Sequence, residues 1–269
     1  MSRLAGKIAI VTGAGSIGPG WGNGKAAAVL FAREGATVYA CDLNLDAARE
    51  TQQIIASEGG TCEVARVDVS DEADVSEMVR NCVDRFGRVD LLHNNVAMYK
   101  RGGPEDISTD DWDKVMAVNL RSLYLTSKFV LPEMVRGGGG SVVNVGSIAG
   151  TRYMGIPTIA YSTSKGAVTS FTQSIAAEYG PKGIRVNSVV PGSIDTPVMR
   201  MTAPGGPNSV TDETVAARSA SIPLRRLGDA WDIARASAFL LSEEAAYITG
   251  AVLMVDGGLS LSAPLPSKS

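Results

Sequence analysis

The chain has few of the residues that build metal and redox sites. It contains one histidine and three cysteines among 269 residues. Cys41, Cys62 and Cys82 lack metal-ligand or redox-pair spacing, so we interpret them as buried free thiols in a reducing compartment. No cluster of histidine, cysteine and acidic residues predicts a metal site. His93 lies within an apolar run, which predicts a packed, hydrogen-bonded side chain rather than a catalytic one.

Basic charge and long apolar runs are also scarce. A net charge of -3 and a pI near 5.3 argue against nucleic-acid binding, which normally needs a basic face. No run approaches the length of a membrane span. The first apolar run begins at Lys7, which leaves no room for a targeting segment before it. We therefore expect a cytoplasmic protein that binds neither nucleic acid nor membranes.

The length suits a single α/β domain, 1–269, with a large core. Short β-branched runs alternate with helical patterns. The runs are continuously apolar, which is typical of strands buried on both faces, so we predict a doubly wound parallel sheet with helices on both faces. The predicted strands, about seven, are 7–12, 37–42, 62–67, 91–94, 141–145, 185–190 and 251–255. The predicted helices are 24–34, 45–58, 72–86, 110–131, 161–179 and 229–241.

Local signals mark where some of these elements begin and end. Ser108 precedes two acidic residues and is a predicted helix N-cap. The stretch 197–223 is rich in proline and glycine and then weakly helical, and a loop of this length predicts a substrate lid. Glycine accommodates a left-handed helix cap at low cost, and four glycines follow predicted helices: Gly35, Gly59, Gly87 and Gly180.

A glycine-rich segment, TGAGSIGPGWGNGKA (12–26), follows the first apolar run. Such a turn between a strand and a helix suits a dinucleotide, because glycines permit a tight turn, a close approach to pyrophosphate and close helix packing. Asp42 ends the next strand, where a carboxylate can bind both adenosine ribose hydroxyls of NAD and repel the extra phosphate of NADP. Neither Leu43 nor Asn44 is basic. The alternative is that Asp42 only caps the next helix.

The segment YSTSK holds the densest chemical signal. Tyr161 and Lys165 are four residues apart, so they share one face of a helix. Tyrosine alone titrates near ~10, and a nearby ammonium stabilises the phenolate and lowers that pKa. The pair therefore predicts a proton donor or acceptor, although this spacing also occurs by chance.

Together and in this order, the motifs resemble those of the short-chain dehydrogenase/reductase family over essentially the whole chain. The matching motifs are TG (12–13), DV (68–69), NNVA (94–97), VNL around Asn119, VNVGS ending at Ser147, YSTSK (161–165), PGSIDTP (191–197) and VDGG (255–258). The resemblance implies a Rossmann-type fold, a homotetramer and a hydride transfer between a secondary alcohol or ketone and a nicotinamide cofactor. Asp42 predicts that this cofactor is NAD rather than NADP.

The resemblance also assigns roles. Tyr161 is the general acid or base, Ser147 binds the substrate oxygen, Lys165 lowers the tyrosine pKa and binds the nicotinamide ribose, and Asn119 holds a water. The implied cofactor-binding residues are Gly13, Gly22, Asn23, Gly24, Asp42, Leu43, Asp68, Val69, Asn95, Val96, Ala97, Tyr161, Lys165, Pro191, Gly192, Ile194 and Thr196. The candidate residues for a small-molecule substrate are Ser147, Ile148, Arg152, Tyr153, Met154, Ser193, Val198 and Met199.

The opening loop departs from the family pattern, which spaces its glycines more closely. Aligning GNGKAAA makes Gly13, Gly22 and Gly24 the functional trio and places a five-residue insertion within 14–21. We expect Gly15, Gly18, Pro19 and Gly20 to serve an excursion of this loop. We expect Trp21 to pack against the loop, to cover the cofactor or the mouth of the site, or to contact a neighbouring subunit. In NNVA, Val96 and Ala97 also replace the family's alanine and glycine.

Several other activities are weighed against this prediction. Enoyl reductases of the same superfamily also lengthen the loop, but a longer spacing than the three residues here separates their catalytic tyrosine and lysine. Members acting on nucleotide sugars carry a C-terminal substrate domain for which this chain has no room. An acyl-carrier-protein ketoreductase would usually take NADP, against which Asp42 argues. A catalytically silent dinucleotide sensor would not need an intact set of catalytic residues.

Overall fold

The strands of the chain form one seven-stranded sheet in the order β3-β2-β1-β4-β5-β6-β7, and every pair is parallel. The structure is a computed structural model that describes residues 2–203 and 210–261. The predicted doubly wound parallel sheet is confirmed. The strands are β1 (Ile8–Thr12), β2 (Thr37–Asp42), β3 (Cys62–Arg66), β4 (Leu91–Asn94), β5 (Gly140–Val145), β6 (Ile184–Pro191) and β7 (Val252–Val255).

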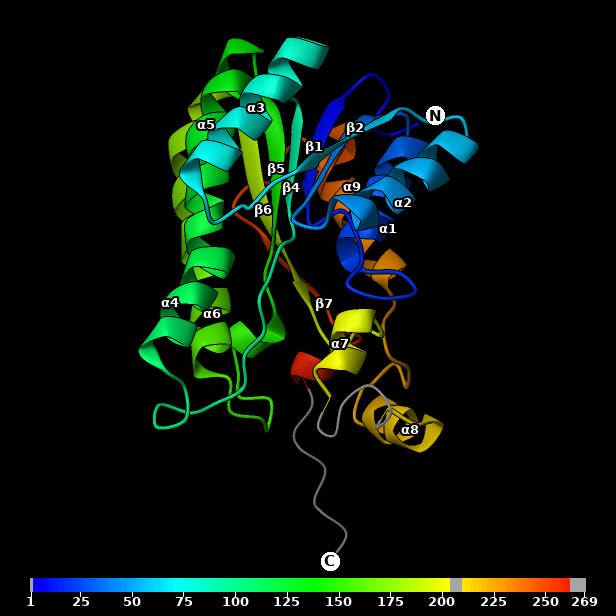
Figure 1. Cartoon of the computed structure of the whole chain (residues 1–269), viewed down its shortest axis with the longest axis vertical. Coiled ribbons are helices and arrows are strands. Elements are labelled where there is room, and N and C mark those ends of the chain that lie inside the picture. The colour runs from blue at the N-terminus through cyan, green and yellow to red at the C-terminus, as the bar shows by residue number, and fades with distance from the viewer. Residues whose placement is uncertain (1, 204–209, 262–269) are drawn as a thin grey trace, which may run out of the picture.

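Helices cover both faces of the sheet, as predicted (Figure 1). Helices α1, α2 and α9 lie on one face, and α3, α4, α5 and α6 lie on the other (Figure 1). The helices are α1 (Asn23–Arg33), α2 (Leu45–Ser57), α3 (Glu72–Phe86), α4 (Thr109–Met116), α5 (Ser122–Arg136), α6 (Ile159–Tyr179), α7 (Pro197–Met201), α8 (Asp212–Ala220) and α9 (Ala230–Leu241). In the described part of the chain, no helix is both long and apolar enough to cross a membrane.

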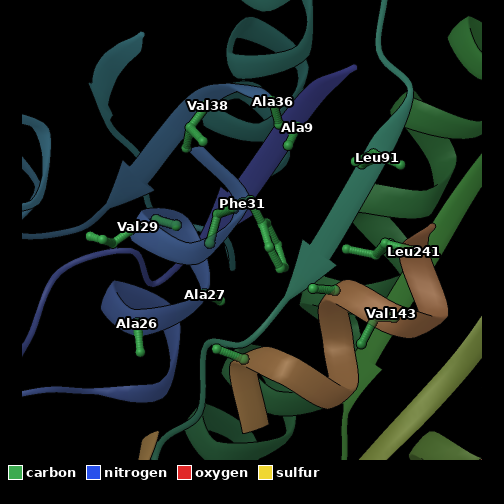
Figure 2. Close-up of a cluster of buried hydrophobic side chains, with 14 of the residues drawn as sticks. Ala9, Ala26, Ala27, Val29, Phe31, Ala36, Val38, Leu91, Val143 and Leu241 are labelled. Carbon is green, nitrogen blue, oxygen red and sulfur yellow. The ribbon is translucent and has the colours of Figure 1, made fainter. Parts of the chain in front are cut away.

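Small apolar residues bring α1 close to the sheet. Figure 2 shows Ala27 and Phe31 of α1 in the cluster that also contains Ala9 of β1, Val38 of β2 and Leu241 of α9. These side chains are fully or almost fully buried, so the central strands have apolar neighbours on both faces. This burial explains their continuous apolar runs and fixes the carboxyl end of β1 in place.

The strand order changes direction at β1, because β2 and β3 lie on one side of this strand and β4 to β7 lie on the other. This strand pairs with β2 on one side and with β4 on the other, so Thr12 and Asn94 end side by side in register. In open parallel sheets a ligand binds outside the carboxyl ends of the strands at such a point. The topology therefore places the glycine-rich segment and the NNVA motif at one crevice.

The boundary signals are mostly confirmed. Ser108 accepts a hydrogen bond from Asp111 N at 3.1 Å, and Gly35, Gly59 and Gly87 have positive φ angles. The predicted left-handed cap at Gly180 is wrong, because its φ is -52°. There α6 continues into a 3-10 turn (Gly180–Lys182), and Gly183 adopts the left-handed conformation instead.

The predicted lid, 197–223, is described in two parts. Helix α7 begins it and α8 follows at Asp212–Ala220, which agrees with the weak helical pattern. Pro204, Gly205, Gly206 and Pro207 lie outside the described residues.

His93 is packed, as predicted. Its ring is fully buried, its Nε2 lies 3.1 Å from Ser237 Oγ, and it meets Phe31 edge-on with ring centroids 5.5 Å apart. Nδ1 has no partner within the part of the chain that the structure describes. Burial therefore lowers the pKa of His93 from its ordinary 6.5 to about 3.

This shift predicts an acid-dependent loss of stability. Because His93 binds a proton below about pH 6.5 only in the unfolded chain, the free energy of unfolding should fall by about 2 kcal/mol between pH 7 and pH 5. His93→Gln keeps a polar partner for Ser237 but removes this titration, so its stability should fall less over the same interval. Denaturant unfolding at both pH values measures the difference. Equal pH sensitivity of the two proteins would contradict the prediction.

Candidate active site

Gly24 lets the first helix approach the first strand closely. A Cβ built at Gly24 would overlap Gly13 O and lie 2.6 Å from Asn95 Nδ2. Gly13 itself has a φ of +65°, which favours glycine. These contacts agree with the predicted roles of Gly13 in a tight turn and Gly24 in close helix packing.

The excursion of the loop does not include Gly15. Gly15 is buried, its N–H donates to Asp42 Oδ2 at 2.9 Å, and a Cβ there would lie 2.6 Å from Ala47 Cβ. Ala14 is also buried. The expectation that Gly15 serves the excursion is therefore wrong, because it packs between the end of β2 and α2. We therefore place the five-residue insertion after this packed turn, at residues 17–21.

The N-terminus of α1 is suited to an anion. Gly22 is its N-cap, and among the described residues no side chain caps this end and no acidic residue lies in its first turn. By contrast, Asn44, Asp71 and Ser108 cap α2, α3 and α4 with their side chains. An uncapped helix start presents N–H groups and a positive dipole end to a phosphate. Beside it, the buried Asn23 Oδ1 has no partner within the described chain.

Acidic side chains end the neighbouring strands. Asp42 Oδ1 accepts from Asn44 N at 2.9 Å, while Oδ2 accepts from Gly15, so the backbone holds this carboxylate in place. After β3, Asp68 accepts from the N–H and hydroxyl of Ser70, which lowers its pKa. Leu43 is exposed beside Asp42, and Val69 is buried. The carboxylates of Asp42 and Asp68 form a polar edge that can bind ribose and adenine.

The NNVA motif closes the opposite side of the crevice. Asn95 N donates to Thr12 Oγ1 at 3.2 Å, and Asn95 Nδ2 donates to Gly13 O at 3.1 Å. The methyl group of Val96 lies beside Gly13, because a Cβ at that glycine would be 3.1 Å from Val96 Cγ2. Ala97 is exposed. The motif is thus joined to the end of β1.

Three predicted catalytic side chains converge beyond the end of β5. Ser147 follows β5, and α6 carries Tyr161 and Lys165 on one face. Ser147 forms a side-chain hydrogen bond with Tyr161. Lys165 is buried, and its Nζ donates to Val145 O at 2.7 Å.

Burial changes the proton affinity of both members of the α6 pair. It raises the pKa of Tyr161, and the hydrogen bond from Ser147 only partly opposes this increase. Burial lowers the pKa of Lys165 from 10.5 to about 8. The expected lowering of the Tyr161 pKa by the ammonium is therefore not found, because desolvation penalises the charged form of each group.

Asn119 lies in a π-helical turn, Ala117–Arg121, between α4 and α5. Its Oδ1 accepts from Met98 N at 2.6 Å, and its Nδ2 donates to Met98 O and to Ser164 Oγ at 2.9 and 3.0 Å. Ser164 in turn donates to Tyr161 O at 2.7 Å. The side chain therefore links the segment after β4 to the first turns of α6. The predicted helix 110–131 is divided by this turn and extends to Arg136.

The end of β6 meets the end of β7. A Cβ at Gly192 would lie 2.6 Å from Asp256 Cα, so the PGSIDTP and VDGG motifs are in close contact. Pro191 and Ile194 are buried, and Thr196 Oγ1 accepts from Met199 N at 3.4 Å as the N-cap of α7. The PGSIDTP loop, which is predicted to lie on the nicotinamide side, therefore leads directly into α7 through its N-cap Thr196.

The candidate substrate residues differ in exposure. Ile148 is buried, Ser193 and Met199 are half-buried, and Arg152, Tyr153, Met154 and Val198 are exposed. Sequence reasoning missed Tyr99, whose ring meets the Tyr161 ring edge-on with centroids 5.2 Å apart. Its position just after NNVA, in a loop leading from the cofactor crevice, was the available signal.

The comparisons with known proteins agree with this geometry. A family model described as enoyl-(acyl carrier protein) reductase matches residues 18–260. The chain is 38% identical over 263 residues to 2,5-dichloro-2,5-cyclohexadiene-1,4-diol dehydrogenase LinX of Sphingobium indicum, covering 97% of this chain and 98% of that protein.

Solved structures show the same similarity. A Burkholderia xenovorans chain provisionally assigned as a short-chain dehydrogenase/reductase superposes with a TM-score of 0.90 at 41% identity, covering 97% of this chain and 99% of that one. A 7α-hydroxysteroid dehydrogenase in complex with NADH and 7-oxo glycochenodeoxycholic acid superposes with a TM-score of 0.86 at 34% identity, covering 96% and 95%. With its parallel sheet and this similarity over nearly its whole length, the chain belongs to the short-chain dehydrogenase/reductase family of NAD(P)-dependent oxidoreductases.

Proposed function

We propose that the chain is an NAD-dependent dehydrogenase that interconverts a secondary alcohol and a ketone. The observation that carries this proposal is the meeting of Ser147 and Tyr161 beside the buried Lys165 at the end of β5. A hydroxyl, a phenol and an ammonium in one place provide what a carbonyl group needs: a hydrogen-bond donor and a proton donor.

In this proposal the protein residues manage the proton and the substrate oxygen. Tyr161 takes the hydroxyl proton during oxidation and returns it during reduction. Its raised pKa favours the protonated phenol, which is the form needed for ketone reduction. Ser147 donates a hydrogen bond to the substrate oxygen and stabilises the negative charge that develops there. Asn119 positions the first turns of α6 through Ser164. Its role in holding a water near Lys165 stays a prediction.

The residues of the crevice fit a nicotinamide dinucleotide. The uncapped start of α1 would bind the pyrophosphate, and Gly13 and Gly24 leave the space that a Cβ would fill. Asp42 and Asp68 would bind the adenosine part, and the unpaired Asn23 Oδ1 can accept a further hydrogen bond. When bound, the nicotinamide supplies the hydride acceptor or donor. Ile194 and Thr196 would fix its carboxamide.

The test is the absorbance of reduced nicotinamide during incubation with a panel of secondary alcohols, with NAD and with NADP in parallel. Turnover of at least one alcohol is expected, with a higher kcat/KM for NAD. If no alcohol or ketone is turned over with either cofactor, while NAD still binds, the chain is a dinucleotide sensor rather than a dehydrogenase.

Asp42 should determine the cofactor preference. The half-buried carboxylate of Asp42 would lie next to the additional phosphate of NADP, and the repulsion between the two negative charges disfavours NADP binding. The same carboxylate can accept charge-assisted hydrogen bonds from the ribose of NAD. Asp42→Ala should therefore lower the ratio of kcat/KM for NAD to that for NADP by about tenfold to hundredfold, chiefly by weakening NAD.

A matched control is available on the next helix. Asp46→Ala removes the same charge from an exposed side chain that pairs with Arg49, and it should leave the ratio unchanged. The basic residue beside Asp42 in the sheet is Arg66, its register partner on β3. The Arg66 guanidinium lies 4.0 Å from the Asp74 carboxylate and is paired with it rather than directed to an NADP phosphate. Comparable efficiency of the unmodified protein with NAD and NADP would refute the role of Asp42.

A further inference from the structure

The insertion, residues 17–21, has no part in the functions assigned above, yet one end of it is firmly anchored. Trp21 packs against Trp231 of α9 with ring centroids 4.7 Å apart. Lys25 Nζ lies 5.4 Å from the centroid of Trp21, and the Arg33 guanidinium lies 4.9 Å from that of Trp231. Aromatic and cation–π contacts of this kind stabilise a fixed arrangement. The insertion is thus attached to two helices of the core.

The other end of the insertion reaches α7. A Cβ at Gly18 would lie 3.7 Å from Pro197 Cβ and 4.0 Å from Met201 Sδ, and a Cβ at Gly20 would lie 3.8 Å from Pro197 Cγ. Ser16 Oγ donates to Gly18 O at 2.8 Å and closes the turn. Figure 1 shows the same proximity, with the dark-blue loop before α1 running toward α7. The backbone of the insertion is therefore a direct neighbour of the helix that carries Val198 and Met199.

Helix α7 is linked in turn to the segments around Tyr161. Arg101 Nη2 donates to Thr202 O, directly after α7, at 2.8 Å. The next residue, Gly102, donates from its N–H to Pro157 O at 3.0 Å. The insertion lies next to α7, and hydrogen bonds join α7 to the segment after β4 and that segment to the one before α6. Together they form one rim beyond the carboxyl ends of the strands, where Tyr161 also lies.

Large apolar side chains are exposed on this rim. Ile17, the first residue of the insertion, is 62% exposed. Single exposed apolar residues are ordinary on a protein surface, whereas several on one rim mark a ligand-binding surface. The exposed large apolar residues of the rim are Ile17, Tyr153, Met154, Val198 and Met201.

We propose that the insertion is part of the substrate site. It lies against α7 at Gly18 and Gly20 and supports this helix, and it adds Ile17 to an apolar rim that accepts secondary alcohols with a bulky apolar group. This inference rests on the proposed function, because it assigns the substrate class to the same site. In this view Trp21 is a positioning residue that holds the insertion against α9, and Ile17 contributes to specificity.

The first experiment compares two alcohols, cyclohexanol and 2-propanol, which share the carbinol group and differ in apolar size. The unmodified protein should have the higher kcat/KM for cyclohexanol. Ile17→Ser should lower that kcat/KM by about tenfold through KM, because apolar contacts in a pocket give discrimination of this order, and it should change 2-propanol by less than about twofold. Val135→Ser, at an exposed apolar residue of α5, is the matched control. Equal losses for both alcohols, or no loss for cyclohexanol, would overturn the assignment of Ile17.

The second experiment needs no turnover. Hydrogen exchange of the backbone amides of 198–202 reports how firmly α7 is held. In Trp21→Ala these amides should exchange about tenfold faster than in the unmodified protein, whereas Trp112→Ala, on α4, should leave them unchanged. Unchanged exchange in Trp21→Ala, or equal acceleration in both variants, would show that the insertion does not support α7. If neither alcohol is oxidised while another alcohol of the panel is, the inferred substrate class fails; if no alcohol or ketone of the panel is turned over, the proposed function fails. In both cases this exchange experiment still decides the supporting role.

Discussion

Tyr161→Phe should lower kcat by about 10²–10⁴-fold and leave the affinity for NAD nearly unchanged, because a positioned acid or base contributes a rate factor of this size. The substitution removes one hydroxyl, while the ring keeps its edge contact with Tyr99. Lys165 keeps its hydrogen bond to Val145 O, so the cofactor side of the site should be preserved. Steady-state kinetics and calorimetric titration with NAD measure the two effects separately.

The same helix offers the control. Tyr179→Phe makes the identical change at the far end of α6, where the Tyr179 ring faces the Lys182 ammonium. It should leave kcat within about twofold, because no group of the site lies there. Near-normal turnover in Tyr161→Phe would mean that another group transfers the proton. A large loss in Tyr179→Phe would show that the effect arises from a general disturbance of α6.

Gly24→Ala should weaken NAD binding far more than Gly18→Ala. A methyl group at Gly24 would overlap Gly13 O and crowd Asn95, so α1 must move away from the phosphate-binding turn. Overpacking of this kind costs about 1–3 kcal/mol, and a cost of this size in the bound state corresponds to about fivefold to 150-fold in Kd. At Gly18 the same methyl group would find its nearest neighbour, Pro197 Cβ, at 3.7 Å, an ordinary contact, and the loss should be less than about threefold.

Calorimetric NAD titration of the two variants decides between them, after circular dichroism has shown that each is folded. The comparison is controlled internally, because both variants add one methyl group to a glycine of the same glycine-rich segment, 12–26. If Gly18→Ala proves more damaging, the assignment of Gly13, Gly22 and Gly24 as the phosphate-binding trio is wrong, and the insertion itself binds the phosphates.

The parallel sheet was predictable because the apolar composition of each strand is a local property of the sequence. Strands buried on both faces must be apolar throughout, as Val38 and Leu91 are, and this composition is visible in the sequence. The same holds for Ser108, whose capping partner Asp111 is three residues away. It also holds for the shared face of Tyr161 and Lys165, which follows from the helical repeat.

The sequence predictions that the structure corrects lie where a local signal competes with contacts from elsewhere in the chain. A glycine after α6 suggested a left-handed cap, but Pro181 allows a further 3-10 turn, and Gly183 ends the element instead. The pattern of 110–131 suggested one regular helix, whereas the structure has a π-helical turn that directs Asn119 to Met98 and Ser164. Such turns are frequent at functional sites.

By itself, the amino-acid sequence determined the class of fold, because this depends on periodicity and on residue type. Through its resemblance to a known family it also predicted the residues that bind the cofactor and carry the chemistry, and these assignments stay predictions. Only the tertiary structure decided that Gly15 holds Asp42, that Tyr99 lies against Tyr161, and that Trp21 meets Trp231. It also decided the direction of the Tyr161 pKa. The physical reason is that desolvation and side-chain contact depend on which distant segments pack together, and no local pattern records that packing.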